Sequence, residues 1–137
     1  MVRPIGYDPR EFDAACTDYY NDKSRIAPSV DAQKMITYGK LPNKKYMINW
    51  PGHGNDIYLN QIDQSPADRI QSMETAKQQT LRFIYFLQDQ LGFRNLALAD
   101  DEFGTADRMP WMLYHREGRR MQGLTRFKIQ HIARPFR

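Results

Sequence analysis

The sequence predicts an α+β fold: one long central helix over about residues 66–91, with shorter helices packed on a small antiparallel sheet. Three observations predict it. Apolar residues recur at helical spacing between Ser65 and Gly92, two segments (46–50 and 125–130) have strand patterns, and prolines and glycines separate these stretches. With 137 residues, 41% of them hydrophobic and 26% charged, we expect residues 1–137 to form a single domain with its own core.

The N-terminal part predicts two helices. Asp8 is a favourable N-cap, Pro9 suits the first helical position, and Glu11 stands three residues after the cap. Helical spacing then continues to about residue 20 through Phe12, Ala15, Cys16 and Tyr19. A second, short helix is expected within residues 29–39, carrying Met35 and Ile36 and ending at Gly39.

Strands are expected in three places. Residues 46–50 follow a proline turn and place Tyr46, Ile48 and Trp50 on one face. The apolar run 96–99 is a second short candidate. Residues 125–130 form the third, because Thr125, Phe127 and Ile129 alternate with polar side chains.

The long helix has the clearest boundaries. Ser65 caps it, Pro66 occupies the first helical position, and Gly92 stops it. One stripe repeats every three to four residues: Ile70, Met73, Lys77, Thr80, Ile84, Leu87 and Leu91. Further apolar residues widen the face after position 81, so we expect the 81–91 half to be central and the 68–79 half to be exposed.

Several function classes lack their usual signals. The only Gly-x-Gly is Gly52-His53-Gly54, and no third glycine or helix follows it, so there is no dinucleotide fingerprint and no phosphate loop of the Walker type. No apolar stretch approaches the roughly 20 residues of a membrane span. Residues 1–8 lack the apolar core of a signal peptide, which makes a cytoplasmic location the default expectation.

The loop at residues 51–55 is the first candidate site. His53 and Asn55 follow an expected strand, where His53 could transfer a proton or donate a hydrogen bond into a cleft. The same residues are equally compatible with a structural turn, since Asn and Asp side chains bond their own backbone. The acidic run 100–102 could hold a cation with Asp56, but calcium loops space their carboxylates at alternate positions, which favours a surface loop and no metal site.

The second candidate is the basic C-terminal part. Residues 116–137 hold seven Lys/Arg and one Glu, a net charge of +6. A dense group at the start of this segment could clamp a carboxylate or phosphate. It consists of His115, just before the segment, and Arg116, Glu117, Arg119 and Arg120 within it. A solvated basic surface patch explains the group equally well. A non-enzymatic anion- or nucleic-acid-binding module therefore remains an alternative, although no nucleic-acid motif is present.

Four short strings of the sequence carry a resemblance to a known family. They are Leu41-Pro42-Asn43-Lys44-Lys45-Tyr46-Met47-Ile48-Asn49-Trp50-Pro51, His53-Gly54-Asn55-Asp56, Leu98-Ala99-Asp100-Asp101-Glu102-Phe103, and Tyr114-His115-Arg116-Glu117 with Arg119-Arg120. These strings resemble a bacterial family of FAD-dependent oxidoreductases, similar to the fumarate-reductase-like flavoproteins. Their order and separation also resemble the family, over about residues 7–136. Gly52, Gly104 and Gly118 depart from its pattern.

The resemblance implies that this chain is the inserted substrate or cap region of a larger flavoprotein, a fragment without the FAD-binding segments. It places Arg116, Glu117, Arg119 and Arg120 toward the flavin and substrate, with His115 beside them. Together with the loop residues, we expect Arg116, Arg119 and His53 to be catalytic, and His115, Glu117, Arg120 and Asn55 to face substrate or cofactor. FAD would belong to the parent enzyme, so we expect this chain alone to bind none and to be inactive. The implied partners are the flanking flavin-binding segments and a small anionic substrate; we expect no membrane partner, and some self-association through bare apolar faces.

Overall fold

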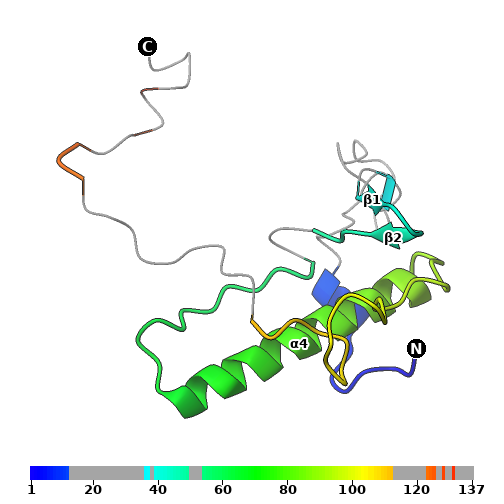
Figure 1. Ribbon diagram of the computed structural model, residues 1–137, viewed down its shortest axis with the longest axis horizontal. Coiled ribbons are helices and arrows are strands. Elements are labelled where there is room, and N and C mark those ends of the chain that lie inside the picture. Colours follow the sequence, from blue (N-terminus) through cyan, green and yellow to red (C-terminus); the bar gives the residue numbers. More distant parts are fainter. Residues whose placement is uncertain are drawn as a thin grey trace.

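The computed structural model describes residues 1–12, 36–37, 39–49, 54–112, 123–125, 128 and 131. Its elements are a 3-10 helix η1 (Pro9–Phe12), two short strands β1 (Lys40–Leu41) and β2 (Lys45–Tyr46), and one long helix α4 (Pro66–Asp89). In Figure 1, the hairpin and η1 lie near the C-terminal half of α4, and the segment after the helix folds back along it. The predicted α+β class is confirmed, with its long helix and its antiparallel sheet.

Helix α4 begins where its sequence predicts and ends close to the predicted position. The Ser65 side chain accepts a hydrogen bond from the backbone N–H of Asp68 at 3.2 Å, and Pro66 is the first helical residue. At the other end, Gly92 adopts φ +80°, which a glycine tolerates without steric cost, and the N–H of Phe93 donates to Leu87 O at 3.0 Å. The observed helix stops two residues before the predicted position 91.

The core lies on the second half of α4. Phe83 and Leu87 are fully buried, and Phe86 is 5% exposed. These side chains pack against Tyr7 and Phe12, with the Phe12 ring 5.3 Å from the rings of both Phe83 and Phe86. By contrast, Ile70 in the first half is 70% exposed. The 81–91 half is central as predicted, whereas the 68–79 half is only partly exposed, because Ser72 and Ala76 are buried.

Polar contacts hold the N-terminal segment on this core. Arg82 donates from Nε and a terminal nitrogen to the two carboxylate oxygens of Glu11, both at 2.8 Å. Tyr7 donates its hydroxyl to Asp89 at 3.3 Å, and burial together with that carboxylate raises the pKa of Tyr7 to about 12. Both contacts join residues more than 70 positions apart in the sequence.

The two predicted N-terminal helices are only partly described. The first begins at Pro9 as predicted, but its described residues form a 3-10 turn, and residues 13–20 lie outside the description. In the second, Ile36 and Thr37 are helical, and a turn follows at Gly39. Its remaining residues also lie outside the description.

The strand predictions were correct at one position and wrong at others. Strand β2 is Lys45–Tyr46, so it shares only Tyr46 with the strand predicted for 46–50, and it is short because its partner β1 is two residues long. Residues 96–99 are not a strand: the Leu96 carbonyl accepts from the Gln88 side chain of α4 instead of from a neighbouring strand. In 125–130, the described Thr125 and Lys128 are also not in strand conformation.

The hairpin turn has an unusual backbone. Asn43 and Lys44 both have positive φ, 59° and 57°, and the N–H of Lys45 donates to Pro42 O at 3.4 Å. This is the arrangement of a type I′ turn, whose twist matches antiparallel strands. Asparagine tolerates the left-handed region, whereas lysine adopts it at some steric cost. The turn therefore fixes the direction in which the next residue, Lys45, leaves the hairpin.

Within the described residues, no helix is both long and apolar enough to cross a membrane.

Candidate functional site

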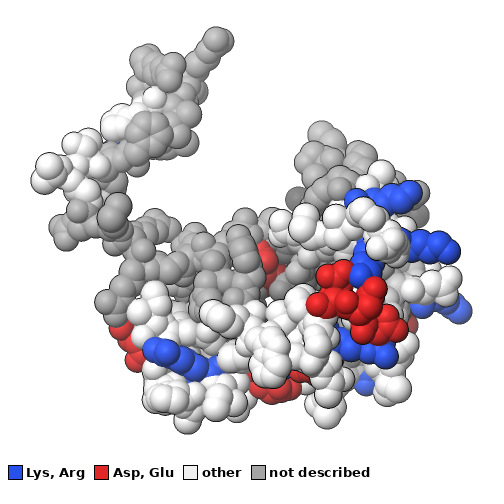
Figure 2. All heavy atoms as spheres, viewed as in Figure 1, with Lys and Arg blue, Asp and Glu red and all other residues white. Residues whose placement is uncertain are grey.

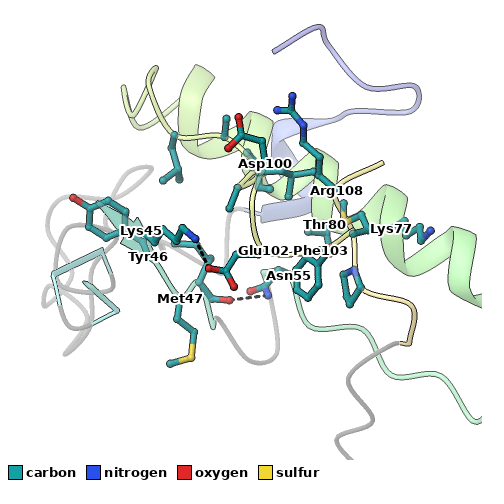
Figure 3. Close-up of a pocket in the computed structure, with 18 of the residues that line it drawn as sticks. Lys45, Tyr46, Met47, Asn55, Lys77, Thr80, Asp100, Glu102, Phe103 and Arg108 are labelled. Carbon is teal, nitrogen blue, oxygen red and sulfur yellow. Dashed lines mark hydrogen bonds and ion pairs between the residues drawn. The ribbon is translucent and has the colours of Figure 1, made fainter. Parts of the chain in front are cut away.

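A cavity of about 730 Å³ lies beside α4 and borders the aromatic core, since Ile48 and Leu96 line the cavity and also pack against the core. Its walls come from four places in the sequence: residues 41–48 of the hairpin, residues 55–59, one face of α4, and the returning chain at 95–103 and 108–110. Cavities that bind small organic molecules have volumes of about 300–1,000 Å³, so this one is large enough for a substrate. Figure 3 shows the labelled side chains around it.

Asn55 is the only predicted site residue that the structure describes, and it lines this cavity. Its side-chain nitrogen donates to Ile48 O at 3.0 Å, which ties residues 55–59 to the hairpin (Figure 3). The neighbouring Gly54 is buried, and its carbonyl accepts from the Gln79 side chain of α4 at 2.9 Å. This loop therefore joins the hairpin wall to α4 and places Asn55 at the cavity, and the bond of Asn55 reaches Ile48 and not the backbone of its own turn.

The other predicted site residues cannot be located. His53 and the group formed by His115, Arg116, Glu117, Arg119 and Arg120 lie outside the described residues. The same is true of most of the basic segment 116–137. Their roles remain predictions.

Lys45 connects the hairpin to the opposite wall, and sequence reasoning missed it. Its ammonium group pairs with Asp101 at 2.8 Å and with Glu102 (Figure 3), although its side chain is only 19% exposed. The hydrogen bonds to these carboxylates raise the pKa of Lys45, and the same contact lowers the pKa of Asp101. Figure 2 shows acidic side chains gathered beside basic ones on this face.

This pairing also bears on the cation site considered for the acidic run. Two of its three carboxylates are engaged by Lys45, and the described residues contain no group of three His, Cys, Asp or Glu side chains arranged for a metal ion. In the structure, the acidic run instead forms ion pairs with Lys45 of the hairpin.

A second ion pair fixes the returning chain on α4. Lys77 of the helix pairs with Asp107, and the Asp107 carboxylate also accepts from the N–H of Met109 at 3.1 Å. These contacts lower the pKa of Asp107, the contact with Lys77 being the larger cause. They hold Met109, which is 5% exposed, in the cavity wall.

The sequence of the long helix contains a pattern that indicates the cavity wall formed by α4. Lys77 and Thr80 interrupt the apolar stripe of the long helix at positions where the stripe otherwise faces packed side chains. Polar residues at such positions indicate either a solvated edge or a lined cavity. In the structure both line the cavity (Figure 3).

The link between Lys45 and the acidic loop predicts a pH dependence. Asp101, whose pKa is lowered from its ordinary 3.8, stabilises the fold above that value and loses this effect as the pH falls. Lys45, whose pKa is raised from 10.5, stabilises it below that value and loses the effect as the pH rises further. Lys45→Met should therefore destabilise the chain at pH 7 and have a smaller effect at pH 3, measured by urea unfolding.

Lys40→Met is the matched control for that experiment. Lys40 is exposed on the same hairpin and has no ion-pair partner among the described residues. Its substitution should have the same small effect at both pH values. An equal effect of Lys45→Met at pH 7 and pH 3 would show that the pair does not stabilise the fold.

The described residues do not provide a cradle for a diphosphate. The N-terminus of α4 is the end of a long helix, where anions commonly bind, but the Asp68 carboxylate occupies its first turn and the Ser65 side chain caps it. A phosphate there would be repelled by Asp68. No glycine-rich turn connects a strand to a helix in the described part of the chain.

Comparison with known families gives one match. The model of a family described as FAD dependent oxidoreductase matches residues 3–137. Searches of curated proteins and of solved structures found no match.

Proposed function

Because this chain belongs to the FAD dependent oxidoreductase family, we propose that it forms the substrate-side region of such an enzyme, with the cavity beside α4 as part of its substrate site. A flavin performs the hydride or electron transfer when it is bound. The protein positions the substrate and sets the charge around it.

One observation carries this proposal. Three of the sequence strings that resemble the flavoprotein family, at 41–51, 53–56 and 98–103, contribute residues to the same cavity. Lys45 of the first string and Glu102 of the last are 57 positions apart in the sequence, yet their side chains form an ion pair. Strings scattered over the sequence that meet at one cavity are expected of a ligand site, because a binding site needs groups from several segments at once.

The cavity has the properties that a substrate site needs. Its walls are joined to one another by Lys45 and Asn55, and joined to α4 by Lys77 and Gln79. Walls held by such contacts keep their geometry without the ligand, which reduces the entropy lost on binding. The site is thus preorganised by residues that need not touch the reacting atoms.

FAD itself does not fit the residues described, since nothing among them receives its diphosphate. We therefore propose that other polypeptide of the parent enzyme holds the FAD, and that this chain alone is inactive. In this arrangement Arg116, Arg119 and His53 act on the substrate, and Asn55, His115, Glu117 and Arg120 face substrate or cofactor, as the resemblance implies.

Exposed apolar side chains are available for contact with such polypeptide. Tyr58 is 71% exposed, and Trp111 and Met112, which follow one another in the sequence, are 77% and 72% exposed. Large apolar groups left in water favour association, either with the flavin-binding segments or between copies of this chain.

Co-expression tests the proposal. The coding DNA around this region should specify a glycine-rich dinucleotide motif on its upstream side, and the chain produced together with those flanking segments should purify as a yellow complex. Its visible absorbance should correspond to one FAD per chain. A colourless complex that remains colourless with added FAD would contradict the proposal.

A further inference from the structure

The floor of the cavity is one face of α4. Met73, Ala76, Thr80 and Ile84 are three or four positions apart, so their side chains project to the same side of the helix. Ala76 and Ile84 are 4% and 7% exposed. The floor is therefore largely apolar, and its polar members are Thr80 and Lys77, which is paired with Asp107.

The charged groups around the cavity balance one another. Four described cationic and four described anionic side chains line it: Lys44, Lys45, Lys77 and Arg108, and Asp56, Asp100, Asp101 and Glu102. Lys45 is held by two carboxylates, and Lys77 is held by Asp107. These four positive and four negative side chains sum to no net charge, so a charged ligand gains no net attraction from them to offset the loss of its hydration.

Thr80 offers the floor a single neutral hydrogen-bonding group. Its hydroxyl has no partner within the described part of the chain. The hydroxyl of Thr75, on the same helix, instead donates to Gln71 O at 2.9 Å. A threonine hydroxyl can both donate and accept, so the one at Thr80 can pair with a carbonyl, hydroxyl or amine of a ligand.

We infer that this cavity takes an uncharged, largely apolar ligand that places one polar group against Thr80. The inference rests on the proposed function, because it names the substrate class of the same site. The apolar floor supplies the affinity, the balanced charges of the described lining give a charged molecule no net attraction, and Thr80 fixes the orientation of the ligand. This class differs from the small anion that the sequence resemblance implies.

Two fluorescent dyes test the inference on the 137-residue chain. N-phenyl-1-naphthylamine is neutral and carries one N–H, and 1-anilinonaphthalene-8-sulfonate has the same ring system with an added sulfonate. Direct fluorescence titration should show that the neutral dye binds at least tenfold more tightly. Its affinity should also be the same at low and high salt, because no net charge contributes to it.

Two substitutions locate the dye. Ala76→Phe fills the floor with a ring and should weaken binding of the neutral dye by more than about tenfold, since the ring occupies the volume that the dye needs. Thr80→Val keeps the shape but removes the hydroxyl, and should weaken it about threefold to tenfold, as expected for one lost hydrogen bond. Ile70→Phe is the matched control at an exposed position of the same helix and should leave binding unchanged.

Near-ultraviolet circular dichroism identifies variants that have lost their packing, and Thr80→Val preserves the test if Ala76→Phe does not fold. Equal or tighter binding of the sulfonated dye would overturn the inference. So would the absence of binding by both dyes, or unchanged binding by folded Ala76→Phe and Thr80→Val. None of these results changes whether FAD is recovered with the flanking segments, so the two proposals fail separately.

Discussion

Phe83→Ala is expected to lower the free energy of unfolding by about 3–5 kcal/mol, the usual cost of removing a fully buried phenylalanine ring. Phe83 has no exposed surface, and its ring lies 5.3 Å from that of Phe12 and 6.3 Å from that of Phe86. The substitution removes contacts with η1 and within α4 together. Because small domains are stable by about 5–15 kcal/mol, much of the stability would be lost.

Urea unfolding followed by circular dichroism measures this effect. Ile70→Ala is the control on the same helix, since Ile70 is 70% exposed, and it should change the stability by no more than about 0.5 kcal/mol. Similar losses for the two variants would contradict the placement of the core on the second half of α4.

Arg116→Met is expected to lower turnover of the flavin-containing assembly by about a hundredfold, while FAD remains bound. The resemblance to flavoproteins places this arginine toward the substrate, where a fixed cation orients the substrate and stabilises developing negative charge. Removing one such group from an active site costs about 10²–10³ in rate. Methionine retains most of the length of the side chain without the charge.

Steady-state turnover, with flavin content measured from the visible spectrum, checks this prediction. Arg10→Met is the matched control: Arg10 is 83% exposed and pairs with Asp8, away from the cavity residues. It should leave turnover unchanged. Equal activity of Arg116→Met and wild type would remove Arg116 from the catalytic group.

The long helix was predictable because its signals are local. Ser65, Pro66 and Gly92 mark its ends through interactions within one helical turn, and the same residues cap and stop the helix in the structure. The central position of its second half was also predictable from the apolar spacing, whereas the burial of Ser72 and Ala76 in the first half was not. The predictable features need no knowledge of the rest of the fold.

The strands were harder to predict because a strand requires a partner. Residues 96–99 form a short apolar run that suits a strand, yet no described strand lies beside them, and the Gln88 side chain donates to the Leu96 carbonyl. For the same reason β2 ends at Tyr46, although its pattern of alternation continues. The composition of a segment indicates whether it can form a strand, but whether the strand forms depends on partner residues that are distant in the sequence.

The candidate site shows the same limit. Asn55 was singled out from its loop and lines the cavity, whereas Lys45 was not, because its carboxylate partners are 56 and 57 positions away. No spacing rule joins residues so far apart in sequence. Lys77 and Thr80 were visible as polar interruptions of an apolar stripe, but the cavity that explains them forms only in the folded chain.

We propose that this chain supplies the substrate side of a flavoenzyme and that other polypeptide holds the FAD diphosphate. Equilibrium dialysis of the purified 137-residue chain against FAD is the decisive experiment. It should show no saturable binding, since Asp68 and the Ser65 cap occupy the first turn of α4, and no glycine-rich turn between a strand and a helix is present among the described residues. Retention of one FAD per chain, by this chain alone, would contradict it.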